Sequence, residues 1–363
     1  MTARPPITAW PPRDRELWSK ALEPRGLFGG GGAGADWSAA SRFKVACGYN
    51  AWLSWLAARG LLDPDIKAAD RVTRERVSAY VAKIQAELAP YSVLGSIREL
   101  YDALRVMAPE TSWKWLAQFH RSLKAQAHPT RDKLSRVKPP EELIKLGERL
   151  MDEAEAGMER SARRCAVRYR DGLLIALLAY RPIRRKNLAM MRLGRHLIKV
   201  GGLWRIVFAS EETKTRVPYE AVLPAALEPR LEHYLNVHRL VLLGGEPADG
   251  NPDAPPIHPA FDAVWVSEDG IQLTYEAVAF QIVLRTRREF GRSLSPHMFR
   301  DCAATAIAID NPKHIRDASL ILGHADHRTT EKHYNHARSL EASRRHAAML
   351  TSLRERLKAN ETR

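Results

Sequence analysis

The sequence predicts a mainly α-helical protein with one small β-sheet, built as an N-terminal helical bundle followed by a larger α+β domain. Three observations support this prediction. The chain has 363 residues, a length typical of about two domains. Most of it repeats apolar residues at three- and four-residue steps, the period of an amphipathic helix. One segment, residues 203–223, instead has apolar runs on both sides of a polar turn, as paired strands do.

Residues 1–35 are rich in Pro and Gly and end in a Gly-Gly-Gly-Gly-Ala-Gly run. Such a composition is expected to bury too little surface to order itself, so it predicts a flexible N-terminal arm. The first residues lack the apolar core of a signal peptide, and no apolar run reaches membrane-spanning length. We therefore expect a soluble cytoplasmic protein.

Residues 36–126 follow the helical period and predict a compact bundle of about four helices. Either Asp36 or Ser38 is placed to cap the first of these helices. Trp52 and Trp55 lie about one turn apart on it. Aromatic residues at this spacing usually face other helices, so core packing is favoured over stacking on nucleic acid bases.

Residues 127–140 are polar, basic and proline-containing, which is typical of a linker. A basic linker either follows a phosphate backbone or is simply solvated. The second domain, residues 141–363, is mostly helical. Its β signal consists of an apolar run, a polar turn and a partly alternating run, at residues 203–209, 210–215 and 217–223.

The chain is basic, with 57 Lys and Arg against 42 Asp and Glu and a formal net charge of +15. The excess is spread along the sequence. Such a balance suits a polyanionic partner, because released counterions drive binding to nucleic acid. Charge alone also fits a protein that is merely basic.

The sequence predicts no metal site and no cofactor site. Three widely spaced cysteines, Cys47, Cys165 and Cys302, form neither a disulfide framework nor a paired metal motif. There is no phosphate-binding Walker loop and no acidic cluster suited to two Mg²⁺ ions. The histidines at positions 324, 327, 333 and 336 lack cysteine partners and the HExxH spacing of a zinc helix.

Five local signals follow one another in the second domain, and each taken alone has an ordinary structural explanation. The first is Arg184, between Arg181 and Arg185, where an apolar helix ends and another begins. Arginines near a helix start bind oxyanions through forked donors. The second is Lys214 in the polar turn, where a hairpin tip can bring an ammonium group to a leaving oxygen.

The remaining signals lie between residues 297 and 334. His297 and Arg300, at i and i+3 after Ser295-Pro296, pair a proton-transfer group with a phosphate-binding group on one helical face. His324 follows Leu322-Gly323 at the predicted end of an apolar helix. Tyr334 comes ten residues later, and its hydroxyl is a competent nucleophile only beside cations and a proton acceptor.

In this order, the five signals resemble the catalytic set of the tyrosine recombinase (phage integrase) family. The resemblance covers residues 141–340, and residues 36–126 look like the core-binding domain of that family. The chain departs from the usual pattern in the lead into Arg184, and Asn187 stands where an acidic residue is usual. Arg181 and Arg185 therefore stay as alternatives for the first arginine.

The resemblance implies that Tyr334 attacks a DNA phosphodiester, forming a 3′-phosphotyrosyl bond and freeing a 5′ hydroxyl. It also implies that His297 accepts the tyrosine proton and that Lys214 protonates the leaving oxygen. A second strand then reverses the reaction, so that neither ATP nor metal is required.

For the phosphate itself, the resemblance implies that Arg184 and Arg300 hold the non-bridging oxygens and that His324 donates a further hydrogen bond. The implied partner is double-stranded DNA, bound by a homotetramer on paired sites. Residues 337–360 read as an amphipathic helix that docks either on a neighbouring protomer or on its own domain.

The same residues fit two other readings of the function. A type IB topoisomerase or a transposon-borne recombinase would share the catalytic chemistry. A recombinase fold reduced to DNA binding would not cleave DNA at all.

Overall fold

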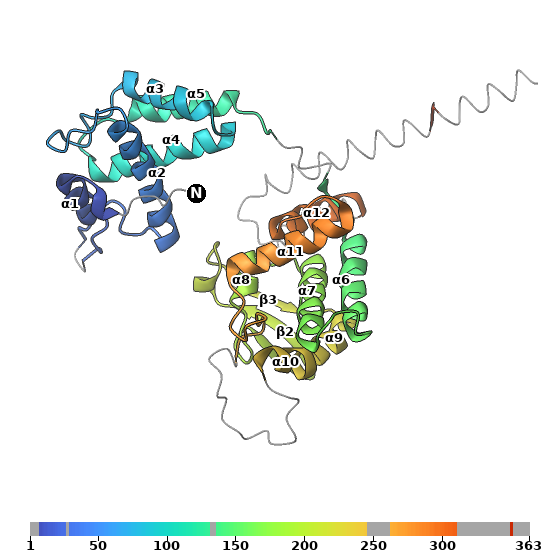
Figure 1. Ribbon diagram of the computed structural model, residues 1–363. Coiled ribbons are helices and arrows are strands. Elements are labelled where there is room, and N and C mark those ends of the chain that lie inside the picture. Colours follow the sequence, from blue (N-terminus) through green and yellow to red (C-terminus); the bar gives the residue numbers. More distant parts are fainter. Residues whose placement is uncertain (1–6, 27–28, 131–135, 245–261, 311–348, 351–363) are drawn as a thin grey trace, which may run out of the picture. The chain divides into compact units, whose positions relative to one another are not determined.

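The computed structural model describes residues 7–26, 29–130, 136–244, 262–310 and 349–350 (Figure 1). The chain divides into two compact units, Met1–Asp132 and Lys133–Arg363. The division falls within the segment expected to be a linker. The described residues are mainly helical, with one three-stranded antiparallel sheet, which confirms the predicted fold class.

The N-terminal unit consists of one 3₁₀ turn and five helices: η1 (Ile7–Ala9), α1 (Pro12–Ala21), α2 (Ala39–Ala57), α3 (Arg74–Gln85), α4 (Pro90–Met107) and α5 (Lys114–Gln126). Of the two expected caps for α2, Ser38 is the one used, because its hydroxyl oxygen accepts the Ser41 amide at 3.2 Å. Trp52 and Trp55 are buried and stacked, with ring centroids 5.1 Å apart. Their predicted place in the core is confirmed.

The expectation of a flexible arm over residues 1–35 is wrong for the region around α1. Trp10 and Trp18 are buried in the same core as α2 to α4. Asp14 is fully buried, where it accepts the Tyr49 hydroxyl at 2.7 Å and forms an ion pair with the equally buried Arg71. The composition rule failed because a few large apolar side chains and one paired charge are enough to dock a short helix, whatever the surrounding glycine content.

The second unit contains helices α6 (Pro140–Glu155), α7 (Ala162–Tyr180), α8 (Arg185–Ala189), α9 (Glu228–His233), α10 (Arg239–Leu243), α11 (Tyr275–Phe290) and α12 (Pro296–Asp310). Short 3₁₀ turns η3 (Ser210–Glu212) and η4 (Ala225–Leu227) and the π-helical turn η5 (Tyr234–His238) complete the helical elements. The strands are β1 (Leu197–Val200), β2 (Leu203–Phe208) and β3 (Tyr219–Val222).

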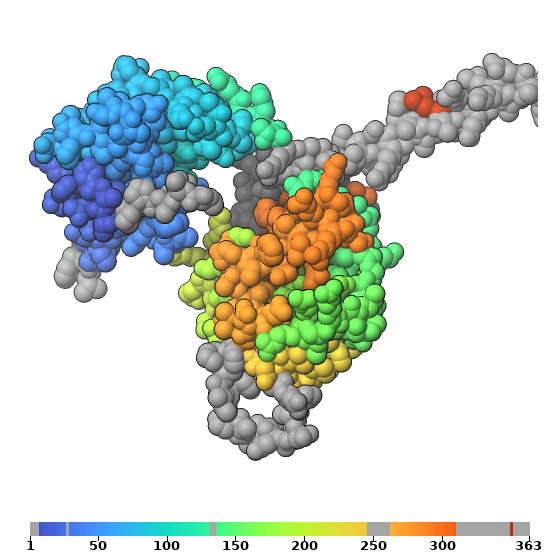
Figure 2. All heavy atoms as spheres, in the orientation of Figure 1, coloured from blue at the N-terminus to red at the C-terminus, as the bar shows by residue number. Residues whose placement is uncertain are grey.

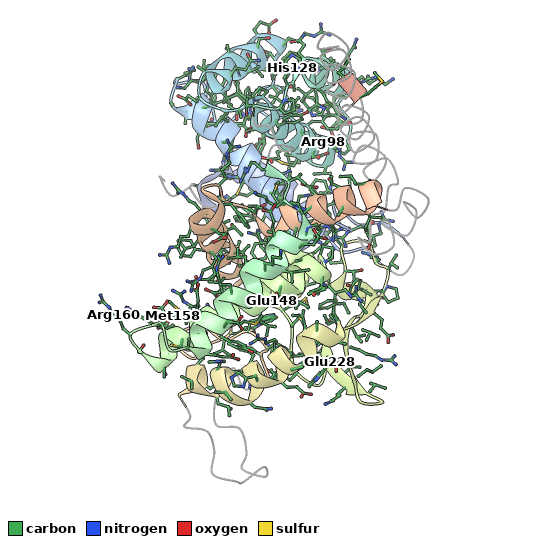
Figure 3. The ribbon with its side chains drawn as sticks, turned by 90° about the vertical axis from the view of Figure 1, so that its right-hand side faces the viewer. Arg98, His128, Glu148, Met158, Arg160 and Glu228 are labelled. Atoms are coloured by element: carbon green, nitrogen blue, oxygen red, sulfur yellow. The ribbon has the colours of Figure 1, made fainter. Side chains whose placement is uncertain are left out.

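Helices α6 and α7 pack closely against each other in this unit. A Cβ added at Gly172 would lie 2.6 Å from the carbonyl oxygen of Gly147, so both positions need glycine for this approach. Glu148, next to Gly147, marks α6 in Figure 3, and Met158 and Arg160 project from the connection to α7. Helices α11 and α12 contact α7 and form one continuous surface, coloured orange in Figure 2. The long and largely buried helix α7 therefore supports the elements that carry the site.

The sheet has the order β1-β2-β3, with Leu197 opposite Ile206 and Phe208 opposite Tyr219. The strand pair predicted around the polar turn is confirmed as β2 and β3. Strand β1 was missed because its four residues, Leu-Ile-Lys-Val, are too few to show an apolar period. The signal that could have found it is Gly201-Gly202, both with positive φ, which forms the two-residue hairpin turn into β2.

Within the described ranges, no helix combines the length and the apolar composition that crossing a membrane requires.

Replacing Asp14 by Ala is expected to destabilise the N-terminal unit by about 3–5 kcal/mol, because it leaves Arg71 buried without its carboxylate. Urea unfolding followed by tryptophan fluorescence measures this loss. Asp36→Ala is the matched control. The side chains of Asp36 and Arg25, which form an ion pair, are 70% and 63% exposed, so this pair is expected to contribute less than about 1 kcal/mol to stability. Equal stability of the two variants would contradict the docking of α1 through this buried pair.

Candidate active site

Arg184 lies where α7 gives way to α8. The chain leaves α7 in an extended conformation at Arg181, and Arg184 is the N-cap residue of α8, with φ −64° and ψ 137°. Its side chain is half-buried, and this burial lowers the pKa of its guanidinium below the ordinary value. The helix start thus presents a partly desolvated cation together with the amide groups of the first turn of α8.

Arg300 reaches the same place from α12. It is 5% exposed, and its Nη1 donates a hydrogen bond of 2.7 Å to the carbonyl oxygen of Pro182. Burial, and secondly the nearby charge of Arg184, lowers the pKa of Arg300 to about 10. Two guanidinium groups that repel each other in a partly desolvated position gain free energy when an oxyanion lies between them.

The other two arginines of the segment are engaged elsewhere. Arg181 donates to the carbonyl oxygen of Val222 on β3 through Nε and Nη2, at 3.3 and 3.1 Å. The guanidinium of Arg185 lies 3.5 Å from the ring centroid of Tyr275. Of the three sequence candidates for the first arginine, Arg184 is the one whose charge acts on Arg300.

Tyr219 on β3 is a member of this cluster that the sequence analysis did not single out. Burial raises the pKa of its hydroxyl, and the charges of Arg181 and Arg300 act in the opposite direction. A tyrosine in a short alternating strand carries no local signal of such a role. Only the pairing of β3 with β2 and the approach of α12 bring it there.

Lys214 lies in the loop between β2 and β3, as predicted, and its side chain is exposed. The loop is tied to α8, because the side-chain amide of Asn187 donates to the carbonyl oxygen of Glu212 at 3.1 Å. Asn187 stands in the position where the family usually carries an acidic residue. It therefore links α8 to the loop that carries Lys214.

His297 lies in the first turn of α12 and is exposed, whereas Met298 and Phe299 are buried. The structure thus brings Arg184 and Arg300 together, ties the Lys214 loop to α8, and holds His297 on the helix that carries Arg300. His324 and Tyr334 lie outside the described residues.

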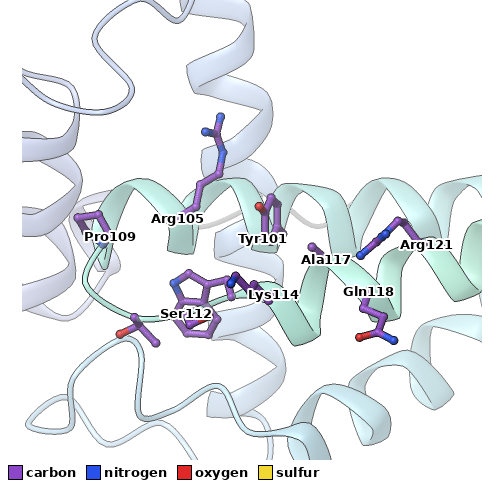
Figure 4. Close-up of a pocket in the computed structure, with 10 residues that line it drawn as sticks. Tyr101, Arg105, Pro109, Ser112, Lys114, Ala117, Gln118 and Arg121 are labelled. Atoms are coloured by element: carbon purple, nitrogen blue, oxygen red, sulfur yellow. The ribbon is translucent and has the colours of Figure 1, made fainter.

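The N-terminal unit has a basic surface of its own, which lines a hollow of about 540 Å³ between α4 and α5 (Figure 4). Its lining is Tyr101, Arg105, Pro109, Thr111, Ser112, Trp113, Lys114, Ala117, Gln118 and Arg121. The lining contains three cationic side chains and no carboxylate. Arg105 is paired with Asp102 beside the hollow, so Lys114 and Arg121 supply most of the positive charge that an anionic ligand would meet.

Comparison with known proteins decides the family. The sequence model of the Phage integrase family matches residues 148–341, which is more than half of the chain. The chain belongs to this family. The resemblance recognised in the sequence is therefore confirmed, and the matched segment runs from within α6 through the Arg184, Lys214 and Arg300 positions.

Among curated relatives, the tyrosine recombinase XerC of Pseudomonas syringae pv. tomato is 38% identical over 74 residues, 20% of this chain and 24% of that protein. XerC of Pseudomonas fluorescens is 29% identical over 147 residues, 40% of this chain and 39% of the relative. The chain thus matches only part of the length of these proteins.

Among solved structures, the XerH site-specific recombinase bound to its palindromic difH substrate in a post-cleavage complex has a TM-score of 0.54. That alignment has 16% sequence identity and covers 84% of this chain and 79% of the XerH chain. At this identity the similarity concerns the fold.

The arginine pair predicts stabilisation of the protein by inorganic phosphate. At a phosphate concentration ten times the dissociation constant, the second unit is expected to gain about 1.4 kcal/mol, or about 3–6 °C in melting temperature. Differential scanning calorimetry in phosphate, against chloride at matched ionic strength, measures this shift. Arg184→Gln should abolish most of it, whereas Arg205→Gln, which removes an exposed ion pair on β2, should not. An identical shift in Arg184→Gln and in the unmodified chain would argue against the arginine site.

Proposed function

We propose that the chain is a site-specific DNA recombinase that cleaves and rejoins DNA strands through a 3′-phosphotyrosyl link to Tyr334. The observation that carries this proposal is the approach of Arg184 and Arg300, both partly desolvated, where α12 contacts the segment that precedes α8. Membership of the Phage integrase family supports it, because the matched residues include both arginines and Tyr334.

In this proposal, Arg184 and Arg300 bind the non-bridging oxygens of the scissile phosphate and stabilise the charge that develops in the transition state. A pKa of about 10 still leaves Arg300 protonated at neutral pH. Loss of its charge therefore begins only as the pH approaches 10, and the phosphate-binding charge stays constant across the physiological range. His324 donates a further hydrogen bond to the same phosphate.

The proton transfers accompany two bond changes. The hydroxyl oxygen of Tyr334 forms a bond to phosphorus while its proton passes to His297. The bond from phosphorus to the 5′ oxygen breaks, and that oxygen takes a proton from Lys214. The incoming 5′ hydroxyl of a second strand reverses these steps. One phosphodiester replaces another, so the reaction itself needs neither ATP nor a metal ion.

The proposed partner is double-stranded DNA, contacted by both units. The net charge of +15 and the basic hollow between α4 and α5 support binding to phosphates in a salt-dependent manner. We propose further that a homotetramer forms on two paired sites, with residues 337–360 reaching a neighbouring protomer.

A nicked suicide substrate carrying the site next to the protein's own gene is expected to trap a covalent protein–DNA adduct. The nick lets the short fragment diffuse away, so that religation is lost and the adduct accumulates. Denaturing gel electrophoresis detects the retarded band. Tyr334→Phe should abolish it, because the variant lacks the attacking oxygen, while Tyr91→Phe, which alters an exposed tyrosine of α4, should leave it unchanged.

An adduct that persists in Tyr334→Phe would exclude this tyrosine as the nucleophile. Salt-sensitive DNA binding without any adduct would instead favour a recombinase fold that only binds DNA. Relaxation of supercoiled DNA without joining of two sites would favour a topoisomerase.

A further inference from the structure

The loop from Ala209 to Pro218 carries Lys214 between β2 and β3 (Figure 1). A lysine ammonium on an exposed four-carbon stem has many rotamers, so the backbone beneath it has to be held if the group is to act at one atom. The residue just before it, Thr213, is 8% exposed. The base of the loop is therefore part of the packed structure although its tip is in solvent.

Glu212 is the centre of the contacts at this base. Its Oε1 accepts hydrogen bonds from His196 Nε2 at 3.0 Å and Arg195 Nη2 at 2.5 Å. Its Oε2 accepts the amide of Ala209 at 3.0 Å, which closes η3. The carboxylate is 11% exposed, and the hydrogen bond from His196 is the first cause that holds its pKa below the ordinary value. It stays ionised, and both of its oxygens are engaged.

His196 is oriented from its other side. It is 2% exposed, and its Nδ1 accepts the backbone amide of Arg192 at 3.1 Å. An acceptor at Nδ1 places the ring proton of the neutral imidazole on Nε2, which then donates to Glu212. The ring also packs against Phe208, with centroids 5.4 Å apart. A buried histidine whose two nitrogens are both assigned by their partners is a rigid anchor for the carboxylate.

Two further contacts connect this anchor to the loop and to the arginine site. The carbonyl oxygen of Glu212 accepts the Asn187 side-chain amide, which comes from α8 three residues after Arg184. The hydroxyl of Thr213 lies 2.8 Å from the carbonyl oxygen of Val217 and bridges the loop. The chain turns back between them at Arg216, which has a φ of 54°. The position of the loop is thus coupled to the position of Arg184.

We propose that Glu212, held by His196 and Asn187, is the positioning residue that places Lys214 beside the leaving 5′ oxygen. Glu212 does not touch the substrate, and it acts through the backbone of the loop. The inference rests on the proposed function, because it takes Lys214 as the donor. In the step concerned, the bond between phosphorus and the 5′ oxygen breaks with its electron pair on oxygen, and the Lys214 proton neutralises that oxygen.

A substrate with sulfur in place of the bridging 5′ oxygen distinguishes a role of Glu212 in positioning Lys214 from a role in general structural stability. A thiolate leaves without protonation, so this substrate does not need the lysine proton. Glu212→Ala is expected to slow single-turnover cleavage of the oxygen substrate about 10–100-fold, since an ångström of misplacement costs a rate of that order. On the sulfur substrate, the cleavage rate of the variant should be within about threefold of the rate of the unmodified enzyme. This limit is much smaller than the roughly 10²–10⁴-fold in rate that general acid–base catalysis contributes.

Glu220→Ala is the matched control. Glu220 is a glutamate of the same sheet whose ion pair with Arg205 is exposed on β3, so its loss should alter neither rate. Asn187→Ala provides a second test that leaves the carboxylate contacts of Glu212 intact. It should show the same oxygen-specific defect, and it keeps the inference testable if Glu212→Ala melts below the assay temperature.

Equal losses on the two substrates would overturn the inference, because they would mean that Glu212 supports the fold or the arginine site rather than the proton donor. Unchanged cleavage of the oxygen substrate by both variants would overturn it as well. Lys214→Ala tests the underlying function separately. If the sulfur substrate does not rescue Lys214→Ala, the proposed role of Lys214 fails. If it rescues Lys214→Ala alone, only the positioning role of Glu212 fails.

Discussion

The hydrogen bond from Arg300 to the carbonyl oxygen of Pro182 joins the two halves of the candidate site, which are 118 residues apart in sequence. It holds α12 against the extended segment that leads from α7 into α8. Because Pro182 lies two residues before Arg184, this bond brings the Arg300 guanidinium to the segment that carries Arg184. Burial is the main cause that lowers the pKa of Arg300, and the nearby charge of Arg184 adds to it.

The same segment also reaches the sheet. Arg181 bonds to the backbone of β3, and Asn187 bonds to the loop that carries Lys214. The arginine pair, the sheet and the loop are therefore connected by hydrogen bonds. The position of the loop that carries the exposed Lys214 depends on these polar contacts. Buried hydrogen-bonded networks of this kind rigidify a site when every member is satisfied. The arrangement fits phosphoryl transfer, in which the protein contributes mainly position and charge.

The sequence allowed the fold class, the Lys214 hairpin and the buried places of Trp52 and Trp55 to be predicted, because each depends on local periodicity or turn chemistry. It did not allow the docking of α1, where a buried Asp14–Arg71 pair overrides a glycine-rich composition. Strand β1 was missed because four residues are too few to show a period. The choice of Arg184 among three arginines, and the roles of His324 and Tyr334, stay predictions.

By itself, the sequence determined which chemical groups are present and in what order, and that order was enough to recognise the family. Tertiary structure decided what the groups do to one another. In the sequence, Glu212 looks like a solvated turn residue, but the fold brings His196 and Asn187 into contact with it. Tyr219 looks like an ordinary strand residue, but in the fold the charge of Arg300 on α12 acts on the pKa of its hydroxyl. The physical reason is that pKa shifts, ion pairs and hydrogen bonds depend on distances through space, and local sequence patterns contain no information about those distances.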